Sequence, residues 1–104
     1  MLAIFLMTKH GNKGFVLHYH ELIIKNDIPK LDATWRTRIR TAIIEKLSIQ
    51  PETFGVPLRH SLKENWKLRV GDYRIIFTIT DMSILILIIG HRSVVYKELL
   101  SRIN

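Results

Sequence analysis

The segment from residue 66 to residue 90 constrains the fold most, because it has the pattern of three strands joined by two short turns. The runs "WKLRV" (66–70) and "YRIIFTI" (73–79) flank Gly71-Asp72, and a two-residue turn with glycine first suits a type II′ hairpin. After the loop "TDMS" (80–83) comes "ILILIIG" (84–90), whose apolar residues indicate a strand covered on both faces. The sequence therefore predicts an antiparallel sheet.

The register of the first hairpin creates an electrostatic conflict. It pairs Val70 with Tyr73 and so places Arg69 directly opposite Arg74, where like charges destabilise a sheet. Because side chains alternate between the two faces, Lys67 lies on the same face as the two arginines. The opposite face is apolar and suits packing against a helix. Its residues are Trp66, Leu68, Val70, Tyr73, Ile75, Phe77 and Ile79.

Two interpretations of this basic face are open. A solvent-facing cluster of cations is costly to assemble without a ligand, and it is a candidate site for a phosphate group. In the alternative, the arginines diverge into solvent or pair with Asp72 or Glu64.

Further candidate residues follow the last strand. If that strand forms a hairpin about residues 81–82, Gly90 lies opposite Tyr73, and His91 and Arg92 emerge beside the first turn. A register slip of two residues is the alternative. We expect His91, Arg92 and, a few residues on, Tyr96 to converge with the basic face. A histidine there can carry protons near neutral pH.

The rest of the chain supplies one strand and three candidate helices. "FVLHYH" (15–20) alternates enough for a strand, and "ELIIKNDIPKL" (21–31) predicts a short helix disturbed near Pro29. Residues 31–49 form the clearest helix, with Asp32 as its N-cap, and residues 94–104 form a candidate short helix. The apolar stripe of the clearest helix is Leu31, Trp35, Ile39, Ala42, Ile43 and Leu47. The order β-α-α-β-β-β(-α) predicts a small α+β sandwich, an antiparallel sheet packed on two N-terminal helices.

The charge balance favours a polyanionic partner. Sixteen Lys+Arg residues against nine Asp+Glu give a formal net charge of +7 and an isoelectric point near 10.1, which is typical of nucleic-acid binding. Pairing with an acidic protein is the alternative. The long helix adds basic residues that are most simply a solvated face, with RNA contact as the alternative. They are Arg36, Arg38, Arg40 and Lys46.

The chain length suits one domain, which we assign to residues 15–104, and residues 1–14 are expected to be a flexible extension. "MLAIFLM" is far shorter than the ~20 residues that cross a bilayer, and "TKHGNKG" has the composition of a polar linker. An apolar arm packed on the core is the alternative. The chain has no cysteine, which fits a reducing cytoplasm, and its five histidines lack carboxylate or cysteine partners at ligand spacing. We therefore expect no metal site and no cofactor.

Three stretches together resemble the RelE/ParE toxin superfamily, and most closely its RelE branch. They are "DIPKL" (27–31), "HSLKENWKLRVGDYRIIFTI" (60–79) and "ILIIGHRSVVYKEL" (86–99), and the resemblance spans about residues 16–100. It implies a bacterial or archaeal type II toxin. RelE toxins cut mRNA in the ribosomal A site by metal-free chemistry, and a cognate antitoxin wraps around them and silences them. The resemblance therefore implies the ribosome, mRNA and a RelB-like antitoxin as cytoplasmic partners.

The resemblance also assigns roles to single residues. Lys67 matches a catalytic lysine, and Arg74 matches the arginine that binds phosphate. Arg92 matches the arginine that closes the last strand, and Tyr96 matches the C-terminal tyrosine, which can stack on a base. The cations Arg69 and Arg74 next to Lys67 favour its neutral, proton-accepting form, and both can contact phosphate.

This sequence departs from the RelE pattern at two positions. Asn65 stands where many RelE-type sites carry another basic residue, and His91 is a candidate for the acid that other members assign to a histidine. The assignment of base and acid among Lys67, His91 and Arg92 is left open. Some members, such as ParE, inhibit DNA gyrase without using such a cluster, and an inert protein kept as an antitoxin's partner is a third interpretation.

Overall fold

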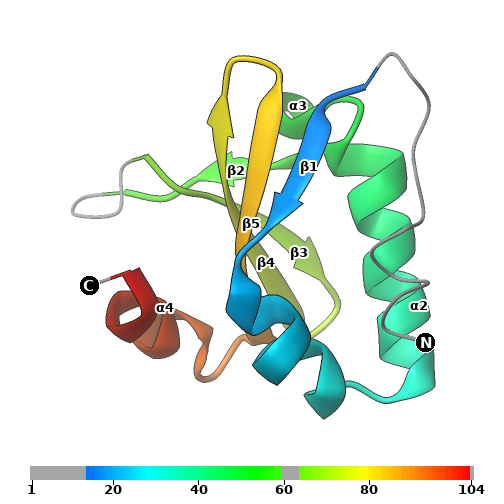
Figure 1. The fold of residues 1–104 in the computed structure, drawn as a ribbon, viewed down its shortest axis with the longest axis vertical. Helices are drawn as coiled ribbons and strands as arrows, with labels where there is room; N and C mark the ends of the chain where they lie inside the picture. Colours follow the sequence, from blue (N-terminus) through cyan, green and yellow to red (C-terminus); the bar gives the residue numbers. More distant parts are fainter. Residues whose placement is uncertain (1–13, 60–63, 104) are drawn as a thin grey trace.

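The computed structural model describes residues 14–59 and 64–103, so nearly all of the expected extension 1–14 lies outside the described residues. Five strands form one sheet in the order β1-β5-β4-β3-β2 (Figure 1). The strands are β1 (Val16–Tyr19), β2 (Val56–Pro57), β3 (Trp66–Val70), β4 (Tyr73–Thr80) and β5 (Ser83–His91). The helical elements are η1 (Ile23–Asp27), η2 (Ile28–Lys30), α2 (Ala33–Ala42), η3 (Ile43–Leu47), α3 (Pro51–Phe54) and α4 (Val95–Ile103).

The predicted α+β fold class is confirmed, with N-terminal helices, a mostly antiparallel sheet and a C-terminal helix. The structure adds the short elements α3 and β2, and it places β1 parallel to β5, whereas the other neighbouring strands are antiparallel. No helix in residues 14–59 or 64–103 is long and apolar enough to cross a membrane.

The first hairpin has the predicted register, with Arg69 opposite Arg74. Gly71 has a φ of 59°, and Asp72 is not among the residues with positive φ, as a type II′ turn requires. A Cβ atom on Gly71 would lie 2.5 Å from Cη2 of Trp35, so only glycine lets the turn approach α2 this closely.

The register of the second hairpin differs from the prediction by one residue. The pairing of β4 with β5 shifts between Ile76 and Phe77, where β5 carries an extra residue in a β-bulge. Tyr73 therefore pairs with His91, and the predicted pairing of Tyr73 with Gly90 is wrong. After a bulge, each residue of the strand lies on the opposite face from the one that unbroken alternation predicts. The bulge therefore changes the face on which residues at the end of β5 lie, which matters for the site.

The main core lies between one face of the sheet and the helices η1 to η3. Asp32 caps α2 as predicted, because its Oδ1 accepts a 2.9 Å hydrogen bond from the backbone N–H of Trp35. The predicted stripe of this helix packs on the predicted apolar face of β3 and β4. The buried core residues include Leu31, Ile39, Ala42, Ile43, Leu47, Leu68, Ile75 and Phe77.

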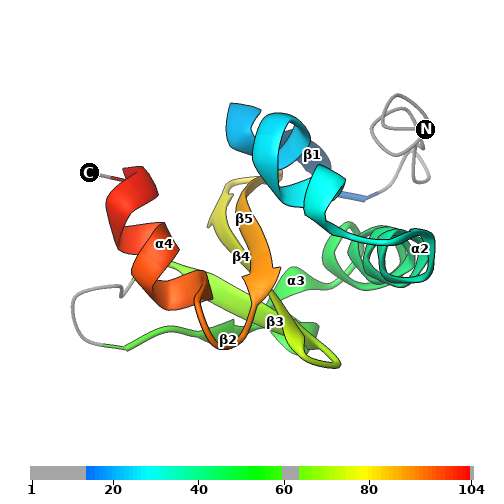
Figure 2. The same cartoon turned by 90° about the horizontal axis from the view of Figure 1, so that it is seen from below.

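A smaller apolar cluster on the other face of the sheet holds α4. Figure 2 shows α4 on the opposite side of the sheet from α2, so helices cover both faces of the sheet. Val95 and Leu99 project from α4 at helical spacing onto the sheet and are fully buried. They pack with Ile76, Leu87 and Ile88 of the sheet.

Candidate functional site

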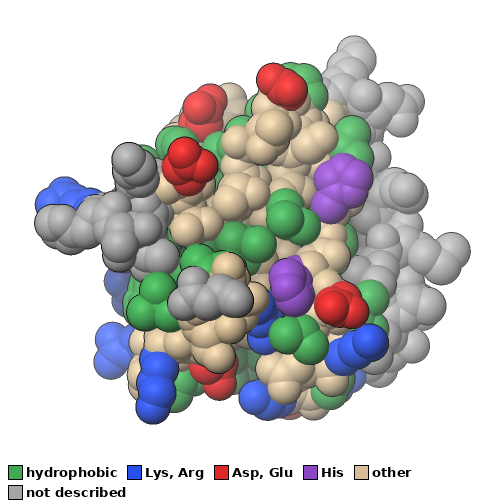
Figure 3. Space-filling model, turned by 60° about the vertical axis from the view of Figure 1, so that its left-hand side comes forward, with side chains coloured by type: hydrophobic (Ala, Val, Ile, Leu, Met, Phe, Trp, Pro, Cys, Tyr) green, Lys and Arg blue, Asp and Glu red, His purple; other side chains and the backbone are tan. Residues whose placement is uncertain are grey.

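The face of the sheet that carries α4 also carries three basic side chains, Lys67, Arg69 and Arg74, which we call the cationic face. Strand alternation positions them, since β3 and β4 turn their apolar residues toward α2. Lys67 and Arg74 are half-buried, and Arg69 is exposed. Most of the Lys and Arg side chains visible in Figure 3 lie in its lower half, among hydrophobic side chains.

Carboxylates do not neutralise the cationic face within the described residues. Two ion pairs occur in residues 14–59 and 64–103, Lys25 with Glu21 at 3.5 Å and Arg102 with Asp27 at 2.8 Å. The alternative that the arginines pair with Asp72 or Glu64 is therefore not realised in this structure. The positive charges stay available to an anion.

Arg74 is held by the hairpin itself. Its Nη1 donates to the backbone carbonyl oxygens of Gly71 and Tyr73, both at 3.0 Å. These bonds use one nitrogen and fix the plane of the guanidinium. The remaining donors, on Nε and Nη2, have no acceptor among the described residues, so Arg74 can present a pre-oriented edge to a phosphate group.

Tyr96 of α4 lies beside Lys67. The Nζ atom of Lys67 is 5.9 Å from the centroid of the Tyr96 ring, within cation–π range. Both side chains are half-buried. The predicted meeting of a lysine from β3 with a tyrosine from the C-terminal helix is therefore present, and it depends on where α4 is seated.

Arg92 lies beside the hairpin turn, whereas His91 contacts Tyr73. The backbone N–H of Arg92 donates to the carbonyl oxygen of Asp72 at 2.8 Å, so Arg92 emerges beside the turn as predicted, and it is exposed. The imidazole of His91 contacts the ring of Tyr73 edge-on, at 5.6 Å between centroids. Tyr73 packs against the main core, so His91 contacts a residue of the face opposite the cationic face.

The ring nitrogens of His91 are also engaged locally. Its Nδ1 accepts the backbone N–H of Ser93 at 3.1 Å and lies 2.8 Å from the Ser93 hydroxyl. An acceptor Nδ1 carries no proton, so the neutral ring holds its proton on Nε2. The predicted convergence of His91 with the cations is not present in this structure, because the β-bulge places His91 opposite Tyr73.

A groove extends the basic surface around the edge of the sheet. It encloses about 400 Å³ between α2 and the end of β3. Arg38, Lys46 and Arg69 line it, against one carboxylate, Glu45. The guanidinium of Arg38 lies 4.3 Å from the centroid of the Trp35 ring, which holds it at the groove. The basic side of the long helix thus joins the cationic face through Arg69.

The sequence reasoning missed a buried ion pair between Asp27 and Arg102. Both side chains are almost completely buried, at 2% and 5% exposure. The helical spacing of Asp27 and Arg102 from buried residues indicates that both charges point inward. Asp27 lies four residues after the buried Ile23, and Arg102 lies three after Leu99, so each charge falls on the buried stripe of its helix. Two opposite charges on inward-facing positions are candidates for a pair.

The described residues contain no group of three His, Cys, Asp or Glu side chains placed to share a metal ion. The sheet face instead offers fixed cations, a lysine next to a tyrosine, and space for an extended anion beside them. Such an arrangement can bind phosphate groups and stabilise negative charge that develops on them.

Comparison with known proteins gives both a family and a fold. The family model described as the ParE toxin of type II toxin–antitoxin system, parDE, matches residues 14–96. Among curated proteins, none matches the sequence. The toxin–antitoxin complex RelBE2 from Mycobacterium tuberculosis contains a chain with a TM-score of 0.71 and 24% identity, covering 82% of this chain and 99% of that chain.

Two further solved structures share the fold. The isolated RelE toxin of E. coli has a TM-score of 0.60 and 26% identity, covering 86% of this chain and 99% of that chain. The RelB–RelE antitoxin–toxin complex from Methanococcus jannaschii has a TM-score of 0.60 and 20% identity, covering 78% of this chain and 96% of that chain.

Proposed function

The chain belongs to the ParE toxin family of type II toxin–antitoxin systems, within the RelE/ParE superfamily that its sequence resembles, and from this premise we propose that it is a ribosome-dependent mRNA endonuclease. One observation carries the proposal. The cationic face holds Lys67, Arg69 and Arg74 without a neutralising carboxylate among the described residues, and Tyr96 lies beside Lys67. A toxin that only binds a protein target has no need for this combination.

The proposed reaction is metal-free cleavage of the RNA backbone. The ribose 2′-oxygen attacks the adjacent phosphorus, a base takes the 2′-hydroxyl proton, the bond from phosphorus to the 5′-oxygen breaks, and an acid gives the leaving oxygen a proton. Negative charge grows on the equatorial phosphate oxygens during attack, and preorganised cations stabilise it. We assign this charge stabilisation to Arg74 and Arg92, with Arg69 as a further phosphate contact.

Lys67 is our candidate for the base, since it lies on the cationic face beside Tyr96, on the same face as Arg69 and Arg74. Tyr96 presents its ring beside Lys67 and is our candidate for stacking on a base next to the scissile phosphate. His91 contacts Tyr73 on the other face and is not part of our proposed catalytic set. The leaving oxygen is then protonated by a residue of the cationic face, by Arg92 or by water.

Inhibition of DNA gyrase is the second candidate function. The match to the ParE family model favours it, whereas the cationic face favours RNA cleavage. The two activities leave different marks in a cell. A nuclease that acts on ribosomes produces mRNA ends within translated frames, while a gyrase inhibitor causes DNA damage without such ends.

The deciding experiment induces the chain in cells and maps RNA 5′ ends against reading frames, with a parallel measurement of DNA breaks. We expect new ends inside translated frames, and we expect them to disappear when translation initiation is blocked. The matched control is Arg74→Ala at equal expression, which should produce none. DNA breaks without in-frame ends would replace the nuclease assignment with the gyrase one, and growth unaffected by induction would favour an inert binding partner.

We also propose that an acidic or amphipathic antitoxin of the RelB type binds this chain. Support comes from the net charge of +7 and from relatives that were solved as toxin–antitoxin complexes, RelBE2 of M. tuberculosis and RelB–RelE of M. jannaschii. Such a partner can lay an apolar helix face in a groove and cover cations. Co-expression with the product of the neighbouring gene tests this, and the proposal fails if no chain encoded nearby binds the toxin or restores growth.

A further inference from the structure

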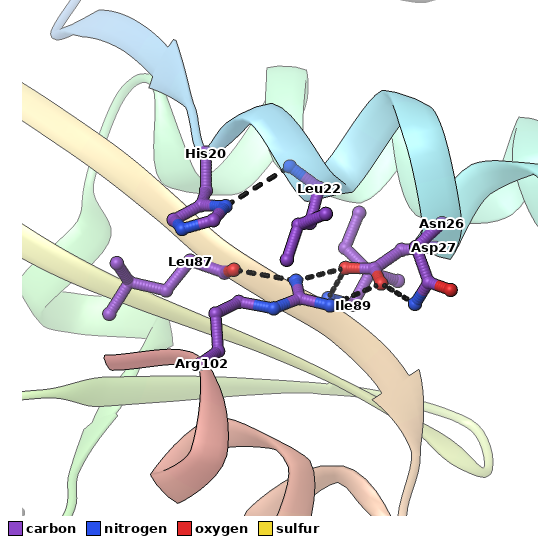
Figure 4. A network of polar contacts seen from close by, with 7 residues as sticks. All are labelled: His20, Leu22, Asn26, Asp27, Leu87, Ile89 and Arg102. Atoms are coloured by element: carbon purple, nitrogen blue, oxygen red, sulfur yellow. Dashed lines mark hydrogen bonds and ion pairs between the residues drawn. The ribbon is translucent and has the colours of Figure 1, made fainter. Parts of the chain in front are cut away.

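The buried ion pair between Asp27 and Arg102 has a geometry that fixes direction as well as distance. Nη1 of Arg102 donates to Oδ2 of Asp27 at 2.8 Å, and Nη2 donates to Oδ1 at 2.9 Å (Figure 4). Two parallel bonds between a planar guanidinium and a planar carboxylate define the relative orientation of both groups. With both side chains almost fully buried, water does not compete for these bonds.

Other groups hold each partner of the pair in place. Asp27 also accepts the backbone N–H of Ile89 and the side-chain amide of Asn26, each at 2.9 Å. Arg102 also donates to the carbonyl oxygen of Leu87 at 2.9 Å. The network therefore joins three elements, η1 through Asp27, β5 through two backbone groups, and α4 through Arg102.

Apart from this network, α4 is held by a small apolar contact, which does not fix the direction of the helix. The buried apolar contacts of the helix come from Val95 and Leu99, and grooves of about 130 and 430 Å³ lie along it, each lined in part by Glu98. Apolar contacts of this kind allow a helix to slide or rotate, since they depend on area more than on angle. The hydrogen bonds of Arg102 to Asp27 and Leu87 are directional contacts that join α4 to η1 and β5.

Tyr96 lies on the same helix, six residues before Arg102, or about 9 Å along the axis. A continuous helix of this length transmits orientation from one end to the other. We propose that Asp27 and Arg102 are positioning residues, which place the Tyr96 ring next to Lys67. Their effect on RNA cleavage rests on the proposed function, whereas their effect on the position of Tyr96 does not.

The first test measures the position of Tyr96 directly by fluorine NMR on protein labelled with 3-fluorotyrosine, with Tyr96→Phe to assign the resonance. Asp27→Asn should shift and broaden the Tyr96 resonance while leaving that of Tyr19, in the main core, unchanged. Asp27→Asn/Arg102→Met removes both charges, so no unpaired charge stays buried, and it should show the same shift if the single variant is too unstable. Glu21→Gln, which breaks the exposed pair with Lys25, is the matched control and should leave Tyr96 at the parent shift.

The second test measures ribosome-dependent cleavage. Asp27→Asn should lower kcat by about 10- to 100-fold with little change in KM, because a displaced group of this kind costs up to ~100-fold in rate. In a Tyr96→Ala background the same substitution should lower kcat no further. Arg102→Lys keeps the charge but not the planar fork, and it should restore part of the rate lost in Arg102→Met.

The inference is overturned if Asp27→Asn and the double variant both leave the Tyr96 resonance at the parent shift. It is equally overturned if Asp27→Asn lowers kcat as much in the Tyr96→Ala background as in the parent, since the pair would then act through general stability. If the parent chain does not cleave mRNA, the proposed function fails and the resonance measurement alone decides on the positioning role.

Discussion

At the scale of single residues, Arg74 carries the sharpest prediction, because the same side chain opposes Arg69 and offers donors to phosphate. Arg74→Ala relieves a repulsion of a few tenths to ~1 kcal/mol, and it loses two exposed or half-buried hydrogen bonds to turn carbonyls. We expect its free energy of unfolding to stay within about 1 kcal/mol of the parent. Cleavage should fall by roughly 100- to 1,000-fold, as for the loss of one donor to a developing anion.

Leu68→Ala is the comparison variant for Arg74→Ala, because it should lower stability, whereas Arg74→Ala should not. Leu68 is 4% exposed in the main core, so its truncation should cost ~2–5 kcal/mol of stability. Thermal melts and growth assays at matched expression separate the two variants. Arg74 would be a structural residue if Arg74→Ala melted well below the parent or stayed toxic, and the nuclease assignment would then lose its main support.

His91 carries a prediction that follows from the β-bulge. Because its ring contacts Tyr73 and Ser93, away from the cationic face, we expect His91→Ala to reduce cleavage by less than ~10-fold. A general acid would contribute about 100- to 10,000-fold, and its loss would remove one limb of the pH–rate profile. Single-turnover rates across pH, with Arg92→Ala as the comparison, check this. A His91→Ala profile that loses its alkaline limb would assign the acid to His91.

Tyr19 carries a pH-dependent prediction for stability. Burial raises the pKa of Tyr19 from its usual value of 10.0 to about 12. The unfolded chain therefore releases this proton near pH 10, while the folded chain keeps it up to about pH 12. Between these values the unfolded state binds fewer protons, so stability falls as pH rises. Ultraviolet titration of the phenolates should show one late component that Tyr19→Phe removes; three ordinary titrations would contradict the prediction.

At the scale of elements, α2, η3 and β3 together form the basic groove, which we expect to bind RNA outside the scissile phosphate. Arg38→Gln/Lys46→Gln should raise KM several-fold and lower the slope of log affinity against log salt by about 1–2, with kcat nearly unchanged. Lys25→Gln, at an exposed position of η1, is the matched control and should change neither. An unchanged salt slope in the double variant would make the groove a simple solvated surface.

The elements predicted from sequence are those whose patterns are local. The type II′ turn follows from Gly71, the N-cap of α2 follows from Asp32, and the buried stripe of α2 follows from spacing alone. The β-bulge left no local trace, because β5 is apolar on both sides of it. Its consequence, the displacement of His91, therefore could not be read from the strand pattern.

The sequence of α4 alone does not determine the face of the sheet on which this helix packs. Val95 and Leu99 show which side of the helix is buried, but not which of two apolar sheet faces receives it. The cationic face was predicted correctly from strand alternation, and the approach of Tyr96 to this face was expected from the register of the last strand. Spacing along each helix places Asp27 and Arg102 on buried faces, but it cannot show that these two positions, 75 residues apart, meet each other.

At the scale of the whole molecule, the last prediction concerns the extension at residues 1–14, whose first six residues we expect to be dispensable. Residues 14–59 and 64–103 contain the five-stranded sheet, both apolar clusters and the cationic face, and the family match begins at residue 14. A chain that starts at Met7 should keep its melting temperature within a few degrees and its toxicity at matched expression, since a change of 1 kcal/mol shifts the melting temperature of a domain this size by roughly 4–8 °C. The full chain measured in parallel is the control. A larger drop in melting temperature, or loss of solubility, would show instead that the apolar stretch "MLAIFLM" packs on the core and belongs to the domain.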